Sequence, residues 1–469
     1  MIARMAWNVA AMAGLVFLAF VLVVSSAASL KIAAVLVPAL VAGAAILLNP
    51  FLGLVLLVLF AQLDAIANML SAGLPLSFYK LLSLATLGGF GLMSYAKRRE
   101  SRLGGRSAET ALVVMFILAM VLSFLQSLHK PEGLDHMIGF LSVILLFFLI
   151  SVLADTPEKL EILLWALVVS GLVSSAIVLL DTLLGIRLVS TSAAAATAQF
   201  EGQSRSAGAS DFNPTTAAHM MMATTIIAGV LFIRHPRFRA LSGLAFLLGV
   251  PALVLTFARS AAIAFGIIAI VFAWHQRGHR FFALTLVLVL LAAGAAIPFV
   301  PPLYWERMWT LFDFGLDRTL LRRVSYNIIG LELWAQHPVL GVGPGNFPQY
   351  YASAEFRFMP GREPLPRQLH NSYMEVAAEM GLLGISLFLG VMLSAQRKAR
   401  LAAAQAATAM RPLASALAYG FAAFLIGSVF MPNEDTKFMW ILPALCVAAW
   451  RLSLPAAGAG AKDISSREY

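Results

Sequence analysis

The sequence predicts an all-α polytopic membrane protein with about 12–14 transmembrane helices and one long helical loop. Of its 469 residues, 60% are hydrophobic and only 12% are charged, whereas about a quarter of the residues in a soluble domain are charged. Apolar runs recur along the chain at close to the roughly twenty residues that a span needs. The short segments between these runs hold most of the cations, which is typical of topology signals.

The first apolar run resembles a signal peptide, but more apolar runs follow it at once, so we expect an uncleaved first span. About fourteen runs are candidate spans by the twenty-residue criterion. They lie near residues 8–28, 32–48, 51–70, 77–96, 111–128, 136–154, 161–184, 215–233, 240–257, 260–275, 281–300, 371–394, 412–431 and 438–454.

Loop charge predicts which side of the membrane each loop occupies. With a cytoplasmic N-terminus, the basic segments all fall inside and the short outer loops carry few or no cations. These basic segments are Lys97–Arg106, Arg234–Arg239, His275–Arg280 and Gln396–Arg400. The expected organisation is transmembrane helices in 1–300, a long outer loop in 301–369, further transmembrane helices in 370–454 and a cytoplasmic tail in 455–469.

The composition also excludes several classes of function. The net charge of +10 is explained by topology, so we expect no nucleic-acid partner. Cys446 is the only cysteine and lies in an apolar run, which excludes a disulfide framework and a cysteine metal site. The segment GVGPGNF lacks the Lys-Ser/Thr of a P-loop, so an ATP-driven pump is not expected.

The long outer loop is predicted to contain an amphipathic helix over Leu320–Gln336, which Pro338 ends. GVGPGNF then forms a glycine and proline turn. The apolar residues at helical spacing are Val324, Ile328, Leu331 and Trp334. The loop also holds a cluster of arginines that topology does not explain, at Arg307, Arg318, Arg322, Arg323, Arg357, Arg362 and Arg367.

The stretch LHNSYMEVAAEMGLLG, which follows this loop, places polar residues at the start of a membrane helix. Ser372 and Glu375 have the spacing of a capping box, so the helix begins near Asn371 or Ser372. His370 then lies just outside the helix N-terminus, where a neutral imidazole is favoured and can accept a proton from a hydroxyl. The alternative is an interfacial histidine that packs against the loop.

The acidic residues of this stretch, Glu375 and Glu379, share one helix face and are unlikely to face lipid, where a carboxylate costs several kcal/mol. We expect them, with Asn371, to support the histidine, to pair with an arginine, or to line a wet cavity. A metal site would use both glutamates with His370, but the chain has no H-x-x-E-H or D-x-D pattern. We predict no bound metal and no cofactor.

Arginines at three positions are candidate anion ligands. Arg259 interrupts a long apolar stretch, where it either snorkels to the interface or clamps an anion. Arg322 and Arg323 lie on the predicted loop helix, either as an exposed charged face or as ligands of phosphate oxygens. All three map to the same side of the membrane as His370. Such cations beside a base suit a lipid-linked phosphate substrate, whose leaving group needs its charge neutralised.

With these residues in place, the chain resembles the O-antigen ligase and polymerase family of bacterial membrane proteins. LTFARSAA resembles the family's T-x-S-R segment, with alanine where serine is usual. RVSYNIIGLELWAQHPVLGVGPGNF is similar to its R…HPLLGVGPGNF block, and LHNSYMEVAAEMGLLG to its HN-x-Y-x-x-x-x-x-E-x-G-x-x-G block. FNPTTAAH is similar to a looser PN segment. The resemblance is strongest over about residues 200–400.

The resemblance implies transfer of a glycan from an undecaprenyl-type diphosphate carrier, with inversion, no required metal, and an active site on the periplasmic side of the bacterial inner membrane. By the same resemblance His370 would be the base, Arg259 and Arg323 would bind the diphosphate with Arg322 as the alternative, and Glu379 would support the site. The alanine before Arg259 lacks a hydroxyl that could orient that arginine.

The acceptor stays open at this stage. Lipid A–core would make the chain a ligase, a growing glycan would make it a polymerase, and a serine of a pilin-like protein would make it an oligosaccharyltransferase. A transporter of the same lipid-linked glycan is the alternative from another class, and it would need coupling charges deep in several spans. The candidates for such charges are Asp64, Lys80 and Asp181.

Overall fold

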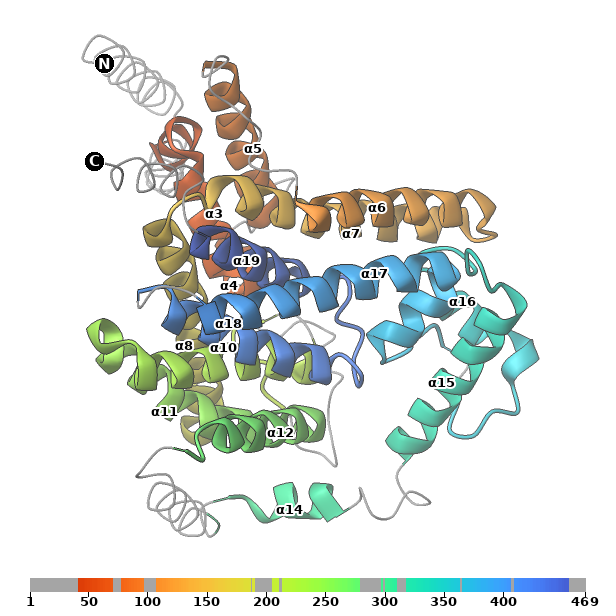
Figure 1. Ribbon diagram of the computed structural model, residues 1–469. Helices are drawn as coiled ribbons and strands as arrows, with labels where there is room; N and C mark the ends of the chain where they lie inside the picture. The colour runs from red at the N-terminus through yellow and green to blue at the C-terminus, as the bar shows by residue number, and fades with distance from the viewer. Residues whose placement is uncertain are drawn as a thin grey trace, which may run out of the picture.

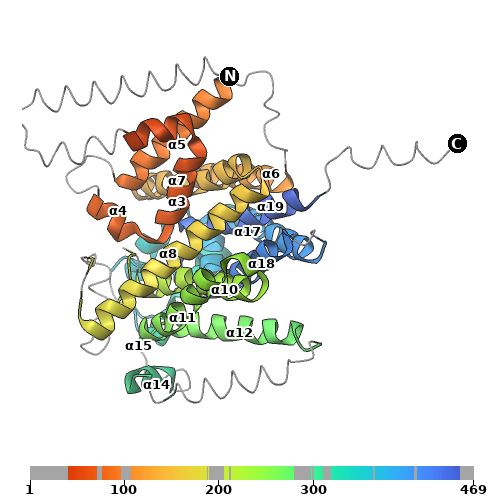
Figure 2. The same cartoon turned by 90° about the vertical axis from the view of Figure 1, so that its left-hand side faces the viewer.

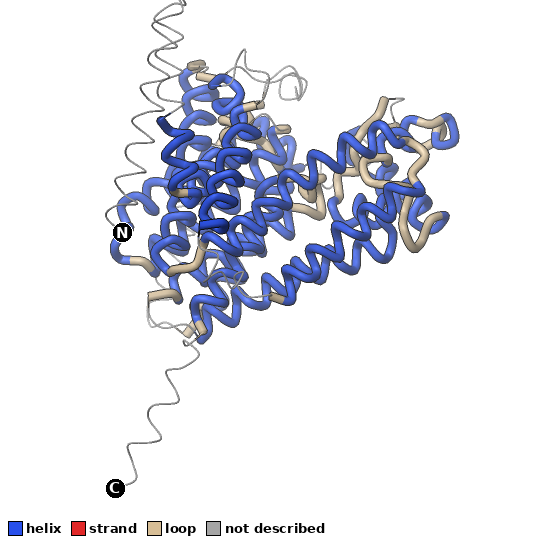
Figure 3. The backbone as a smooth tube through the Cα atoms, turned by 90° about the horizontal axis from the view of Figure 1, so that it is seen from above, coloured by secondary structure: helices blue, strands red, loops and turns tan. Residues whose placement is uncertain are grey.

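The fold is all-α, as predicted: every regular element in the described part of the chain is a helix (Figure 3). The computed structural model describes residues 41–70, 77–96, 107–186, 188–189, 205–210, 213–278, 297, 300–309, 318–362, 365–405 and 409–454. Within these residues, five helices are long and apolar enough to cross a membrane, or six if one bent pair counts as a single span. The chain is therefore a multi-pass membrane protein.

Most of the predicted spans appear as helices with closely matching bounds. Further helices occupy the described parts of the segment between α12 and α17. The helices are Val41–Leu48, α3 (Pro50–Leu59), α4 (Asp64–Leu70), α5 (Phe78–Ala96), α6 (Ala108–Gln126), α7 (Lys130–Leu153), α8 (Pro157–Leu184), α10 (Pro214–Arg234), α11 (Arg239–Leu255), α12 (Arg259–His275), α14 (Pro302–Trp309), α15 (Arg318–Gln336), α16 (Phe347–Ala352), α17 (Ser372–Gln405), α18 (Arg411–Gly427) and α19 (Lys437–Ser453).

One predicted span is wrong. The run 51–70 is not a single helix, because α3 continues into a short 3-10 turn that ends at Gln62, and α4 begins only at Asp64. Both polar side chains are drawn into the protein: Gln62 is buried, and Asp64 forms an ion pair with Lys437 at the start of α19. The predicted runs 8–28 and 281–300 lie almost wholly outside the described residues.

The helices stack in layers that run side by side. α17 packs against α6, α18 and α19, while α10 packs against α18 and α11 (Figure 1). α8 crosses the bundle obliquely over α3, α10 and α11 (Figure 2). Rings from four helices, α6, α7, α17 and α19, form the centre of the core. They are Phe116, Phe140, Phe388 and Trp440, with ring centroids 5.6–6.3 Å apart for the contacting pairs.

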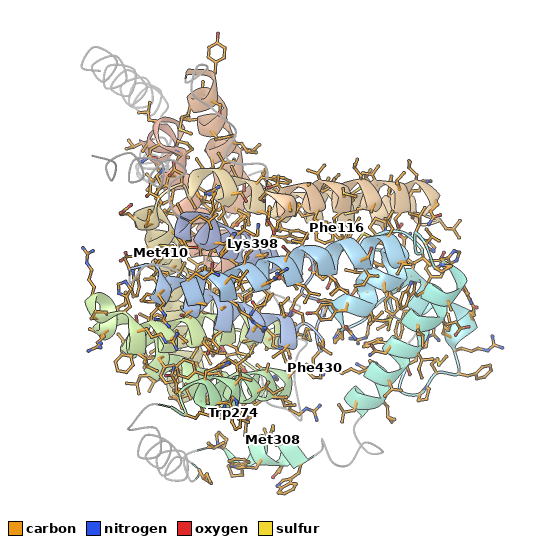
Figure 4. All side chains as sticks on the ribbon, viewed as in Figure 1. Phe116, Trp274, Met308, Lys398, Met410 and Phe430 are labelled. Carbon is orange, nitrogen blue, oxygen red and sulfur yellow. The ribbon has the colours of Figure 1, made fainter. Side chains whose placement is uncertain are left out.

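The bundle has two ends, which we call the site end and the opposite end. At the site end, α12 and α17 begin and α18 finishes; at the opposite end, α10 and α12 finish and α18 begins (Figure 1). Two of the predicted basic segments, Arg234–Arg239 and Gln396–Arg400, lie towards the opposite end, where Arg234 donates to Ser415 at 2.8 Å. The second was predicted as a loop, but it lies within α17, which continues to Gln405. In Figure 4, Lys398 and Met410 lie towards this opposite end, and Phe430 lies at the site end.

The predicted loop helix is present as α15, which leans away from the bundle and contacts α17 (Figure 1). Its buried face differs from the expectation. Tyr326, Ile329 and Leu333 are buried, whereas most of the predicted apolar set is exposed: Val324 at 47%, Ile328 at 42% and Leu331 at 54%. The helix has two apolar faces, and periodicity alone does not tell which of them packs.

The glycine turn, residues 338–347, is set into a break in α17. Gly381 has φ +62° and ψ −163° within this helix, a conformation that is open essentially only to glycine. The break frees backbone groups of α17 on both sides, and the glycine turn pairs with them. The four bonds are Val342 N–H to Ala378 O, Gly343 N–H to Glu379 O, Leu382 N–H to Pro338 O and Leu383 N–H to Val339 O, at 2.8–3.2 Å.

We expect Gly381→Ala to destabilise the protein by about 1–3 kcal/mol or more. Alanine is strained at this φ, and its Cβ would clash with the backbone of Val339. The measurement is the apparent melting temperature in detergent. Gly266→Ala on α12 is the matched control, because a Cβ there meets nothing within 4 Å and alanine favours a helix. Equal melting temperatures for the two variants would contradict the role of the break.

Candidate active site

A cavity of about 610 Å³ opens at the site end, between α12, α15, the start of α17 and the segment after α18. Its wall contains Arg259, Arg323, His370 and Asn371, which come from three distant parts of the chain. The structure therefore brings together four of the residues that the sequence singled out. The other lining residues are Ser260, Ile263, Leu320, Val324, Asn327, Ile328, Leu331, Met374, Val429 and Phe430.

Arg259 is the first residue of α12 and follows a tight turn after α11. The turn forms because Phe257 takes a left-handed conformation, with φ +53°. Arg205 braces it from outside, with its Nε donating to Thr256 O at 2.8 Å and its guanidinium to Thr215 Oγ1 at 3.2 Å. Arg259 is 9% exposed, so its guanidinium is held at the cavity wall rather than in bulk solvent.

The structure separates the two neighbouring arginines of α15. Arg323 lines the cavity, whereas Arg322 does not and its Nε donates to Gly361 O at 3.3 Å outside it. Asn327, one turn further along α15, donates to the carbonyl of Arg323 at 2.8 Å. The sequence spacing did not decide which of the two arginines is the candidate anion ligand. Their placement in the structure favours Arg323.

His370 lies in a left-handed conformation, with φ +62°, and this turn presents its ring to the cavity. Its Nδ1 lies 3.0 Å from the carbonyl of Gln368. That carbonyl can only accept, so Nδ1 carries the proton and Nε2 is left with a lone pair. The ring lies against Tyr326, with centroids 5.1 Å apart. Burial lowers the pKa of His370 to about 4, and the charge of Arg323 contributes to the lowering.

Asn371, not Ser372, caps α17. Its Oδ1 accepts from the backbone N–H groups of Tyr373 and Met374 at 3.2 and 3.3 Å, which corrects the predicted capping box. The Ser372 hydroxyl instead donates to Met431 O at 2.9 Å. The amide nitrogen of Asn371 donates to Asn327 Oδ1 on α15 at 3.0 Å. Asn371 therefore fixes the start of α17 and ties it to the helix that carries Arg323.

The two glutamates of α17 are buried but do not line the cavity. Glu379 accepts from the backbone N–H groups of Gly345 at 2.7 Å and Phe347 at 3.0 Å, so it holds the glycine turn in place. Glu375 lies near Glu434 of the segment between α18 and α19. In the described residues, no group of three His, Cys, Asp or Glu side chains is placed to hold a metal ion.

His219 is a site-end residue to which the sequence assigned no role, although it closes the quoted segment FNPTTAAH. It lies on α10, fully buried, and its Nε2 is 2.9 Å from the hydroxyl of Ser260, the residue after Arg259. A lone histidine in an apolar stretch has no local pattern that marks it. The only available signal was its place within that segment.

The cavity wall combines charge with apolar surface. The exposed aliphatic face of α15 (Val324, Ile328 and Leu331) continues from Arg323 along the same wall. Ile263, Val429 and Phe430 add apolar surface from the bundle, and Phe430 faces the space between the bundle and α15 (Figure 4). Such a wall can hold an amphiphile that has an anionic part and an aliphatic part.

Comparison with known families supports the resemblance. Residues 244–389 match the family model described as O-Antigen ligase. This segment contains Arg259, Arg323, His370 and both glutamates, so it covers all the residues that the sequence predicted for the site. No curated protein matches the chain.

We expect His370 to titrate near pH 4, and thus to be neutral at physiological pH, instead of near 6.5. Histidine-labelled NMR in nanodiscs measures this pKa, and His370→Gln assigns the signal. Arg323→Gln should raise the pKa, because it removes a nearby positive charge. Arg357→Gln is the control, since this arginine lies over Phe358 in the same loop. If the pKa of His370 were the same in Arg323→Gln as in the wild type, the proximity of Arg323 to His370 would be contradicted.

Proposed function

We propose that this chain, whose residues 244–389 match the family model described as O-Antigen ligase, transfers a glycan from an undecaprenyl-type diphosphate carrier to a hydroxyl acceptor. One observation carries the proposal. A single cavity is lined by two arginines, by a neutral histidine with a ring nitrogen available to accept, and by an aliphatic helix face. Each part matches one part of a lipid-linked glycan donor and its reaction.

The two arginines account for the diphosphate. A guanidinium binds phosphate oxygens through two parallel hydrogen bonds and keeps its charge at any physiological pH. Arg259 and Arg323 face one cavity from different helices, so they can hold a diphosphate from two sides. When the bond from the sugar to the diphosphate breaks, negative charge grows on the leaving oxygen. Cations fixed in a partly dry site stabilise that charge best.

His370 accounts for activation of the acceptor. Its Nε2 takes the proton of the acceptor hydroxyl as the oxygen attacks the anomeric carbon. The new C–O bond forms on the face opposite the diphosphate, and the bond to the diphosphate breaks with its electron pair. The configuration at that carbon is therefore inverted. Polyprenyl diphosphate leaves, and the proton stays on His370 until solvent or the product phosphate removes it. The proposed reaction uses no metal at any step.

The aliphatic face of α15 accounts for the lipid. A polyprenyl chain attached to the diphosphate must leave the charged part of the cavity over an apolar surface. Val324, Ile328 and Leu331 supply such a surface next to Arg323. The proposed location of this reaction is the periplasmic side of the bacterial inner membrane. The placement of Arg234–Arg239 and Gln396–Arg400 towards the opposite end of the bundle supports it.

Two related activities share this chemistry. A lipid A–core hydroxyl as acceptor makes the chain a ligase, and a growing glycan makes it an O-antigen or exopolysaccharide polymerase. A transporter of the same lipid has less support. Asp64 pairs with Lys437, Lys80 is exposed and Asp181 is half-buried at the last turn of α8, so these charges do not share one path.

We expect His370→Ala to abolish transfer, because among the described residues that line the cavity no other histidine can replace Nε2, while the protein remains folded and inserted. The measurement is release of polyprenyl diphosphate from a glycan-diphosphate lipid in proteoliposomes, offering lipid A–core and glycan acceptors in turn. Wild-type protein that moves the lipid across the bilayer without consuming it would indicate a transporter. Full transfer by His370→Ala would refute the assignment of His370 as the base.

We expect Arg259→Lys and Arg323→Lys to raise the donor KM by about 10-fold or more, since lysine keeps the charge but loses the two-pronged contact. Arg322→Lys is the matched control on the adjacent residue, whose side chain lies outside the cavity. It should leave the donor KM unchanged. Equal effects of all three substitutions would refute the proposed diphosphate contacts.

A further inference from the structure

A buried chain of hydrogen bonds links the turn that carries Arg259 to the turn that carries His370. It begins at Ser260, whose hydroxyl meets His219 Nε2 at 2.9 Å. On the other side of the ring, His219 Nδ1 lies 3.1 Å from the amide nitrogen of Asn433. His219 and Asn433 are each fully buried, so these bonds are shielded from water and are not readily exchanged for it.

The chain then continues to the start of α17. The backbone N–H of Asn433 donates to the Ser372 hydroxyl at 2.7 Å, and the backbone N–H of Ser372 donates to Ser428 O at 2.9 Å. The Asn433 amide also donates to the Ser428 hydroxyl at 3.1 Å. Ser372 lies two residues after His370. Four helices, α10, α12, α17 and α18, are thus connected through one imidazole and one amide.

The direction of each bond defines the state of the ring. The Asn433 amide nitrogen donates to Nδ1, so Nδ1 is the acceptor and Nε2 carries the proton of the neutral ring. Nε2 therefore donates to Ser260. Both nitrogens are occupied on opposite sides, which suits a fixed spacer and leaves no lone pair for a substrate. His219 is also absent from the residues that line the cavity.

We propose that His219 and Asn433 are positioning residues that set the separation between Arg259 and His370. The inference rests on the proposed glycan transfer. That reaction needs the diphosphate held by Arg259 and the hydroxyl activated by His370 to lie on opposite faces of one carbon. A displacement of about 1 Å between reacting groups can reduce a rate by about 100-fold. The spacer holds the two turns without touching either reacting group.

The kinetic test compares His219→Ala, Asn433→Ala and the double variant. Each single substitution should lower kcat for transfer by about 10- to 100-fold and change the donor KM less, because Arg259 and Arg323 are retained. The double variant should lose no more than the worse single variant, since both break the same link. The proposal would be overturned if the kcat loss of the double variant equalled the product of the two single losses. A normal kcat in folded His219→Ala would also overturn it.

Two further variants separate positioning from general damage. His235→Ala, at the opposite end of the same helix, should leave kcat unchanged. Ser260→Ala removes only one end of the link, and it should reproduce the kcat loss even if His219→Ala fails to fold. Normal turnover by Ser260→Ala would overturn the proposal.

A distance measurement tests the spacer without relying on activity. Spin labels at Ile267 on α12 and Gln368 before His370, both exposed, report the separation of the two elements in a Cys446→Ala background. The distance distribution should broaden or shift in His219→Ala and Ser260→Ala but not in His235→Ala. An unchanged distribution would overturn the spacer. A wild-type protein without transfer activity would instead refute the proposed function, while the distances still test the spacer.

Discussion

The position of the site residues depends on one interaction, the pairing of the glycine turn with the backbone of α17 at its break at Gly381. A continuous helix would offer no free backbone groups to a neighbouring loop, because its N–H and C=O groups are already paired within it. The break exposes such groups on both sides, and Glu379 adds a carboxylate that accepts from two more N–H groups of the turn. The turn directly follows α15. Its pairing with α17 therefore holds α15, and Arg323 on it, at the same end of the bundle as His370.

Two kinds of buried charge differ in what they can do. Glu109 is fully buried on α6 and pairs with Lys398 at 2.5 Å, and Asp64 pairs with Lys437. A polar group in an apolar surrounding is expensive unless its partner is close, and these pairs join helices that are far apart in sequence. Arg259 and Arg323 differ because their side chains line a cavity. Their position gives access to an anionic ligand, whereas the paired charges only connect helices.

Histidines at the site end also take two roles, which their hydrogen bonds distinguish. His370 uses one nitrogen to fix its ring on Gln368 O, and the other is the nitrogen that we propose takes the acceptor proton. His219 uses both nitrogens to join neighbouring helices. The sequence pattern marks His370, because polar residues surround it at a helix start. No local pattern marks His219, because its partners Ser260 and Asn433 are 41 and 214 residues away.

The sequence by itself determined the helical membrane fold, the bounds of most spans, the break between the runs 240–257 and 260–275, and the start of α17. These follow from local hydropathy, glycine, proline and loop charge, which act over about twenty residues. Only the tertiary structure decided that 51–70 is broken, that Asn371 is the cap, that Arg323 and not Arg322 lines the cavity, and that the second apolar face of α15 is the buried one. Each of these depends on a partner from a distant segment, and packing selects between faces that look alike in sequence.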